Sequence, residues 1–228
     1  MSAAAALGQE PLTRSVEDYL KTIYLLSQRG EPAATNDIAH QLELSAPSVS
    51  GMIKRLAEQG LVEHEPYKGV ELTQEGRRLA IRMVRRHRVL EAYLVARLGY
   101  DWDGVHEEAE RLEHAVSDQL INRMAAALGD PQVDPHGDPI PTADGRVEDL
   151  VFPPLVEVNV GSEAEIRRVS ADDPERLRYL ASLGLKPGTR VTVVDRQPFR
   201  GPTTVRVGEQ THILGHELAS TLLCAPSL

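Results

Sequence analysis

Hydrophobic residues recur at helical spacing through the first 60 positions and then alternate with polar ones. The spacing predicts three short amphipathic helices, over residues 15–30, 35–42 and 45–60. Ser45 is a good N-cap for the third helix, and Pro47 is tolerated in its first turn. Two short strands are expected at 61–65 and 70–73, joined by a turn. This order is typical of a winged helix-turn-helix.

Longer helices are predicted next. One runs from about residue 73 to Leu98 and is capped by Gly99, and another runs from about residue 103 to Leu128 and is capped by Gly129. Such helices suit a dimerisation unit. Residues 130–154 contain six prolines and are expected to form an extended connection without a helix.

The last third of the chain has the pattern of short strands separated by Gly and Pro. Strands are expected at 156–160, 165–169, 190–194, 204–207 and 211–214, with one helix at 174–183. This pattern predicts a small SH3-like β-barrel. The fold class is therefore α+β multidomain, and the expected parts are a winged helix-turn-helix (1–74), a helical metal-binding and dimerisation domain (75–140), a linker (141–154) and an SH3-like domain (155–228).

Composition narrows the class of protein. The chain is 41% hydrophobic, but no run approaches the roughly 20 apolar residues that cross a bilayer. Its first eight residues lack the pattern of a secretory leader, so we expect a cytoplasmic protein with no membrane partner. Cys224 is the single cysteine and lies in an apolar stretch, so we expect it to fill space.

The net charge of −9 argues against nucleic-acid binding until its distribution is considered. Residues 1–88 hold 12 Lys/Arg and 11 Asp/Glu, a net charge of +1, whereas residues 89–228 hold 13 and 23, a net charge of −10. The acidic residues are thus concentrated beyond the expected DNA-binding part.

Histidines and carboxylates recur at helical spacing on both long helices. On the second helix, His106, Glu110, Glu113 and His114 share one face, and a further His/Glu pair lies four residues apart on the first helix, at 87 and 91. Imidazole and carboxylate donors without a thiolate suit Mn, Fe, Co or Zn. For any one of these residues, a solvated helix face is the simpler explanation, but the set together favours a metal site.

Several segments together resemble the diphtheria toxin repressor family of iron-dependent and manganese-dependent regulators. The resemblance covers nearly the whole chain and is carried by SVEDYLKTIYLL (15–26), SAPSVSGMIKRLAEQGLV (45–62), RHRVLEAY (86–93), VHEEAERLEHAVSD (105–118), GDPIP (137–141) and LASLGLKPG (180–188). It implies a dimeric transcriptional repressor whose binding to a double-stranded DNA operator is activated by a divalent ion.

The resemblance also implies which residues hold metal. The primary site would consist of Asp18, Glu110, Glu113 and His114, and the ancillary site of His87, Glu91 and His106, so about two ions are expected per chain. Iron-sensing members typically carry Met and Cys at the positions of Asp18 and Glu110. Carboxylates at both positions favour Mn²⁺, with Fe²⁺ as the alternative. Asp18 also fits a capping box that begins at Ser15.

The third helix is expected to enter the major groove of the operator. The resemblance assigns base or methyl contacts to Ser45 and Pro47 and phosphate contacts to the hydroxyls of Ser48 and Ser50. Cationic side chains suited to further phosphate contacts are Lys54, Arg55 and, on the wing, Lys68.

Parts of the sequence are also compatible with other functions. The segment from His106 to Glu110 superficially resembles the helix of a zinc protease, but its fifth position is Glu rather than His, and no separate general base is recognisable. A winged-helix regulator that senses an organic ligand without metal is the remaining alternative. The SH3-like domain could also bind a protein partner or the chain's own linker, and the sequence does not decide whether it donates metal ligands.

Overall fold

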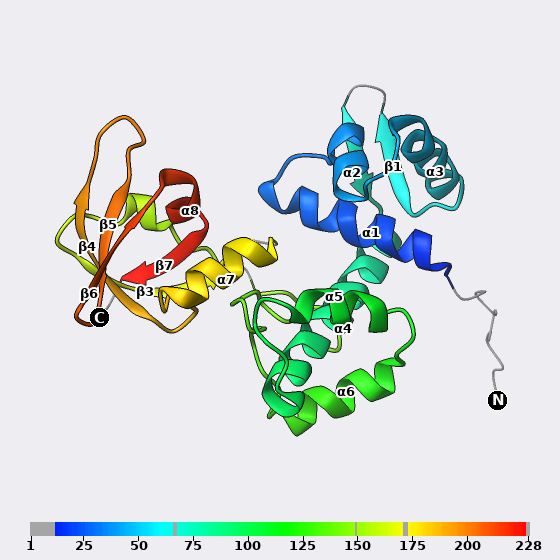
Figure 1. Ribbon diagram of the computed structural model, residues 1–228. Helices are drawn as coiled ribbons and strands as arrows, with labels where there is room; N and C mark the ends of the chain where they lie inside the picture. The colour runs from blue at the N-terminus through cyan, green and yellow to red at the C-terminus, as the bar shows by residue number, and fades with distance from the viewer. Residues whose placement is uncertain (1–11, 66–67, 149, 171–172, 227–228) are drawn as a thin grey trace. The chain divides into compact units, whose positions relative to one another are not determined.

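The computed structural model describes residues 12–65, 68–148, 150–170 and 173–226. The chain divides into two compact units, one up to Arg85 and one from Arg86 onward, and the division falls inside a long helix (Figure 1). Each unit has its own buried core, so each is described by itself.

The first unit consists of helices followed by a small sheet. Its elements are α1 (Arg14–Leu26), η1 (Ser27–Arg29), α2 (Thr35–Gln41), α3 (Ala46–Glu58), β1 (Val62–Glu65), β2 (Gly69–Leu72) and the first half of α4 (Gln74–Leu98). The two strands are antiparallel, with Val62 opposite Leu72. The predicted helices and strands are all present, and the tip of the turn between the strands, at 66–67, lies outside the described residues.

The starts of α1 and α3 show how local sequence sets a helix boundary. Thr13 is the N-cap of α1, and its hydroxyl accepts a hydrogen bond from the Val16 amide at 3.4 Å. Ser15 therefore lies inside the helix, and the expected capping box between Ser15 and Asp18 is wrong. The N-cap of α3 is Ser45, as predicted, and its hydroxyl accepts from the Ser48 amide.

The first turn of α4 packs closely against the segment before β1. A Cβ added to Gly76 would lie 1.9 Å from the backbone oxygen of Leu61, so no side chain fits without a shift of the backbone. We predict that Gly76→Ala lowers the free energy of unfolding by about 3 kcal/mol, because overpacking and backbone displacement add. Gly51→Ala is the matched helical control, since nothing lies within 4 Å of a Cβ there. Chemical denaturation measures both; equal effects would contradict the close approach.

The helical part of the second unit differs from the prediction. Instead of one helix over 103–128 there are two, α5 (Val105–Leu112) and α6 (Asp118–Ala127). Ser117 caps α6 by accepting from the Leu120 amide, and Arg86 donates to Asp118 at 2.9 Å, so side chains of this unit stabilise the interruption. None of the helices in the described residues is both long and apolar enough to span a membrane.

The proline-rich segment after α6 contains no helix in its described residues, as predicted, but it is not a loose linker at its start. Asp134 donates its amide to the Asp138 carbonyl at 3.0 Å, and Val133 pairs with Pro139 as an isolated bridge. The side-chain oxygen of Asp134 accepts from the amides of His136 and Asp138 at 2.8 and 2.9 Å. Residues 133–139 therefore form a tight, internally bonded turn.

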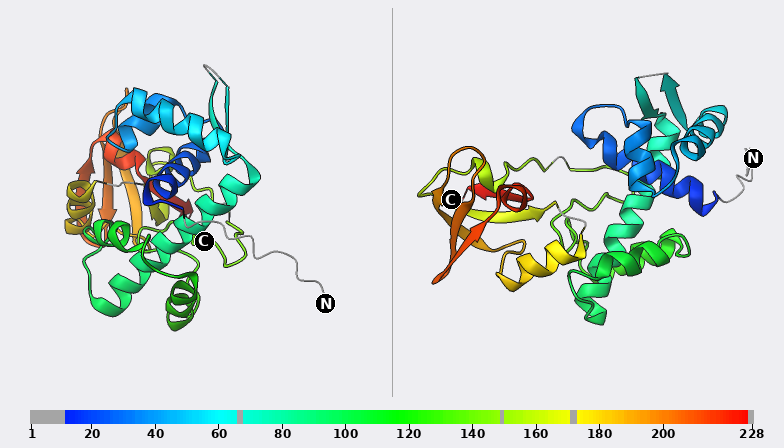
Figure 2. Two further views of the ribbon diagram at one scale, coloured as in Figure 1. Left: turned by 90° about the vertical axis from the view of Figure 1, so that its right-hand side faces the viewer. Right: turned by 45° about the horizontal axis from the view of Figure 1, so that its top comes forward.

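The C-terminal part is a five-stranded sheet with two helices. Its elements are η2 (Leu155–Glu157), β3 (Glu163–Val169), α7 (Pro174–Ser182), β4 (Arg190–Arg196), β5 (Thr203–Val207), β6 (Gln210–Leu214), α8 (His216–Ser220) and β7 (Leu222–Pro226). The strand order is β6-β5-β4-β3-β7. Figure 2 shows this part of the chain, coloured from yellow-green to red, from two further sides. In the described residues β6 and β7 are opposite edges that do not pair, so the expected closed barrel is wrong and the sheet is open.

Two further details of this sheet were not predicted. The expected strand at 156–160 is absent, and its first residues form the short helix η2 instead. The last strand, β7, was missed; it pairs antiparallel with β3 and turns Leu222 and Cys224 into the core. Burial raises the pKa of the Cys224 thiol to about 12, which agrees with its expected role as a space-filling residue.

Candidate metal centre and DNA-binding surface

His87, on α4, is at the centre of a cluster of potential metal donors. Its Nε2 lies 3.0 Å from both Glu91 Oε1 and His106 Nδ1, and its Nδ1 lies 3.9 Å from Glu110 Oε1. His87, His106 and Glu110 each offer a donor atom within 4.8 Å of the others. His87 and Glu91 are one turn apart on α4, and His106 and Glu110 are one turn apart on α5, so two helix faces build this cluster.

A second cluster in this unit consists of Glu91, Asp134 and His136, all of them buried. The Nδ1 atom of His136 lies 3.7 Å from Glu91 Oε2, and its Nε2 lies 2.9 Å from the carbonyl oxygen of Trp102. A histidine that donates one ring N–H to a backbone carbonyl and presents the other nitrogen to a carboxylate is oriented as metal ligands usually are. The donors and their orientation therefore fit a divalent transition ion.

The electrostatics of the second cluster are dominated by crowded acidic groups. Burial, together with the charges of Asp138 and Glu91, raises the pKa of Asp134 to about 7. Burial alone would raise the pKa of Glu91, but hydrogen bonds from His106, His136 and His87 outweigh it and hold that pKa well below its usual value. A cation among these groups would offset the repulsion between the two carboxylates.

The remaining predicted donors belong to two different units of the chain. Glu113, fully buried, and His114 follow the last residue of α5, with Glu113 Oε1 3.6 Å from His114 Nε2 and Glu113 Oε2 2.5 Å from His87 Nδ1. His87 thus contacts donors that the resemblance places in different sites. Asp18 is on α1 in the first unit, half-buried and 3.9 Å from Arg14.

Sequence reasoning missed Asp134 and His136 as donors. They lie in the proline-rich segment whose composition predicts an extended connection, where no helical or strand period marks which side chains point inward. The available signal was an Asp-x-His pair directly before the GDPIP motif. Only the folded turn at 133–139 brings this pair to Glu91.

All but one of the predicted DNA-binding residues lie on one exposed surface at α3 and its N-cap. Ser45, Pro47, Ser48, Ser50, Lys54 and Arg55 are all exposed, whereas Val49, Ile53 and Leu56 on the opposite face are buried. The hydroxyls of Ser45 and Ser48 lie 2.9 Å apart at the start of the helix. Lys68, after β1, is exposed and pairs with Glu65.

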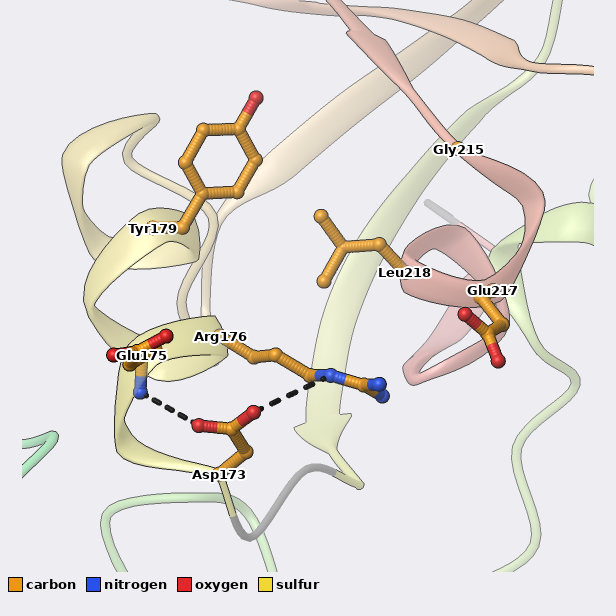
Figure 3. A pocket seen from close by; sticks show the side chains of 7 residues that line it. All are labelled: Asp173, Glu175, Arg176, Tyr179, Gly215, Glu217 and Leu218. Atoms are coloured by element: carbon orange, nitrogen blue, oxygen red, sulfur yellow. Dashed lines mark hydrogen bonds and ion pairs between the residues drawn. The ribbon is translucent and has the colours of Figure 1, made fainter.

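A shallow cavity of about 480 Å³ lies apart from both donor clusters, between α7 and α8. It is lined by Asp173, Glu175, Arg176, Tyr179, Gly215, Glu217 and Leu218 (Figure 3). One of its acidic groups is engaged locally, since Asp173 caps α7 through the Glu175 amide and pairs with Arg176 at 3.6 Å.

Three family models match the chain in sequence. They are the N-terminal DNA-binding domain of iron-dependent repressors (residues 11–70), the metal-binding and dimerisation domain of the same repressors (73–142) and the FeoA domain (154–226). The iron-dependent repressor IdeR of Mycobacterium tuberculosis is 35% identical over 223 residues, covering 91% of this chain and 95% of the relative. The chain belongs to the diphtheria toxin repressor family.

Solved structures of manganese-dependent regulators are also similar to this chain. A manganese-dependent transcriptional repressor in complex with manganese is 44% identical, with a TM-score of 0.86 over 93% of this chain and all of the other. The manganese regulator SloR is 34% identical, with a TM-score of 0.77 over 95% of this chain and all of the other. As a diphtheria toxin repressor family member, the chain is a metal-dependent transcriptional repressor, and neither the metalloenzyme nor the metal-independent regulator is favoured.

Proposed function

We propose that this repressor binds its operator as a homodimer loaded with Mn²⁺, about two ions per chain, and controls genes of manganese or iron homeostasis. The observation that carries the choice of ion is the donor chemistry. The described clusters are built from carboxylates and imidazoles, and Cys224 is buried in the C-terminal sheet. Hard oxygen donors suit Mn²⁺, and because Fe²⁺ accepts the same donors, a direct comparison of the two ions is part of the test.

Two sets of residues would hold these ions. The primary site is proposed to consist of Asp18, Glu110, Glu113 and His114, and the ancillary site of His87, Glu91 and His106. Asp134 and His136 supplement the second set, because both offer donor atoms near those of Glu91. Bound ions would supply positive charge that neutralises these carboxylates, all of which lie in the acidic part of the chain except Asp18.

The proposed switch depends on Asp18, because it is on a different unit from the other donors. When Asp18 and the donors that follow α5 share one ion, α1 becomes tied to the helical domain. In a dimer this fixes the distance between the two α3 helices. The change is a shift between arrangements that already exist, driven by the one that binds the ion better.

On DNA, the first unit is proposed to act as a winged helix-turn-helix. The exposed N-terminal turn of α3 would enter the major groove, with Ser45 and Pro47 at the bases and the Ser48 and Ser50 hydroxyls at phosphates. Lys54, Arg55 and Lys68 would add phosphate contacts. A homodimer has two such DNA-binding units, which match an operator of two half-sites.

A salt titration tests the phosphate contact at Arg55. A plot of log affinity against log salt concentration has a negative slope. We predict that Arg55→Ala makes this slope less steep by about one for each protomer, because one fewer counterion is released. Arg78→Ala is the control, an exposed arginine of the same unit that is bidentate to Glu75. A slope that stays the same for Arg55→Ala would exclude a phosphate contact there.

Capture of genomic fragments tests the function as a whole. The purified protein is mixed with fragments of its source genome in Mn²⁺, in Fe²⁺ held reduced, and in chelator. We expect fragments to be retained only with metal, and at lower free Mn²⁺ than free Fe²⁺. Equal retention in chelator would refute metal activation and favour the alternative of a regulator that senses an organic ligand.

A further inference from the structure

The chain's single tryptophan belongs to one domain in sequence and to another in packing. Trp102 lies between α4 and α5, within the range matched by the metal-binding and dimerisation domain. Its side chain is 8% exposed and is part of the buried core of the FeoA domain, together with Leu155, Leu177 and Leu222. Lys186, of the same domain, lies over the indole ring at 5.3 Å from its centroid.

The polar atoms of Trp102 face the turn that carries the Asp134 and His136 donors. The indole Nε1–H donates to the Pro135 carbonyl at 2.8 Å, and the Trp102 carbonyl oxygen lies 2.9 Å from His136 Nε2. A carbonyl can only accept, so His136 Nε2 is the donor. In the neutral imidazole the lone pair is then on Nδ1, the nitrogen on the side of Glu91.

The FeoA domain also holds the backbone of this turn. The amide of Val169 on β3 donates to the His136 carbonyl at 2.8 Å, and Arg168 pairs with Asp138. Asp138 also accepts from Arg88 of α4 at 3.3 Å. Strand β3 therefore fixes where the turn lies. Trp102 fixes which nitrogen of the His136 imidazole points to Glu91.

We propose that Trp102 is a positioning residue that couples the packing of the FeoA domain to the orientation of His136. The inference rests on the proposed function, since it takes Glu91, Asp134 and His136 as the holders of one ion. Because the indole is part of the FeoA core and the carbonyl of the same residue orients His136, loss of either contact disturbs the other. Ion binding and FeoA docking then stabilise each other by the same free energy.

Three variants of the full chain test the coupling in a calorimetric Mn²⁺ titration. His136→Ala identifies the ion that depends on this turn, because one binding event should be lost. Trp102→Phe keeps an aromatic ring in the FeoA core and the backbone carbonyl, and removes the indole N–H that holds Pro135 together with part of the ring. Val205→Ala is the matched control, since Val205 is fully buried in the same core but lies on β5.

We expect Trp102→Phe to weaken the His136-dependent ion by about tenfold, in the range of changes to groups that orient a metal ligand, and to leave the other ion unchanged. Val205→Ala should weaken neither ion, although it lowers the unfolding temperature. Unchanged affinity in Trp102→Phe, or an equal loss in Val205→Ala, would overturn the positioning role. Failure of the wild-type protein to bind Mn²⁺ would instead overturn the proposed function, and the coupling with it.

Fluorescence gives a second readout that does not depend on how Trp102 variants fold. Trp102 is the only tryptophan, and its ring centroid is 5.3 Å from that of His136, so the emission of the wild-type protein reports on this turn. Mn²⁺ should quench the emission in the wild type with the affinity of the His136-dependent ion, and should leave it unchanged in His136→Ala. Emission that does not respond to Mn²⁺ in the wild type would contradict the coupling.

Discussion

Asp18→Ala should lower metal-dependent operator binding by about 100-fold while leaving the protein folded, a loss within the range of coupling energies between linked sites. Asp18 is the only proposed metal donor from the first unit. Its side chain is 29% exposed, and its pairing with Arg14 at 3.9 Å is of the surface i,i+4 type, worth about 0.3–0.5 kcal/mol. We expect the loss in the metal response, and thermal unfolding shows whether the variant stays folded.

The measurement is operator affinity as a function of free Mn²⁺, with thermal unfolding recorded alongside. Asp37→Ala is a suitable control, because Asp37 is an exposed acidic residue of the same unit, on α2. It removes the same charge and should leave the metal response intact. If Asp18→Ala kept the full metal response, the switch could not depend on a link between α1 and the donors that follow α5.

Gly137→Ala is expected to have the largest effect on the second unit, lowering the free energy of unfolding by about 3 kcal/mol. Gly137 has a φ of +88°, and a Cβ there would lie 2.0 Å from the Arg167 carbonyl oxygen and 2.7 Å from the Arg168 Cα. Both atoms belong to the backbone of β3, so the turn at 133–139 would have to move away from the sheet. The donors Asp134 and His136 would move with it.

Gly161→Ala separates the two causes of this loss, which are the steric contact with β3 and the strain of the positive φ. Gly161 has nearly the same φ, +85°, but nothing lies within 4 Å of an added Cβ. It should show only the strain of the left-handed conformation, about 1 kcal/mol. Denaturant unfolding and Mn²⁺ titration of both variants give the comparison. Similar losses in the two would mean that the approach of the turn to β3 contributes little.

The chain's own pattern was sufficient for the first unit. Apolar residues three and four apart place α1, α2 and α3, and Ser45 sets the start of α3 because its hydroxyl satisfies a free amide. These determinants are local, so they can be read without knowing what each helix packs against. The chemistry of the donors on α4 and α5 was equally visible, since helical spacing brings His87 to Glu91 and His106 to Glu110.

The break between α5 and α6 could not be predicted from the local sequence. Residues 105–128 keep a helical period, and the interruption depends on Ser117 as a cap and on Arg86, which is 32 positions away from its partner Asp118. The open form of the sheet could not be predicted from local sequence either. Period-2 alternation shows that strands exist, but the pairing of β7 with β3 rather than with β6 is a long-range choice.

The sequence by itself thus determined the order of elements in the first unit, the family, the exposed face of α3 and the kinds of atom available to a metal, because each depends on local spacing or residue type. Only the tertiary structure decided that Asp134 and His136 join Glu91, and that Trp102 links them to the FeoA core. The physical reason is that these residues lie in an irregular segment. Its side-chain directions are set by hydrogen bonds to distant backbone, as between Val169 and His136, and not by a repeating period.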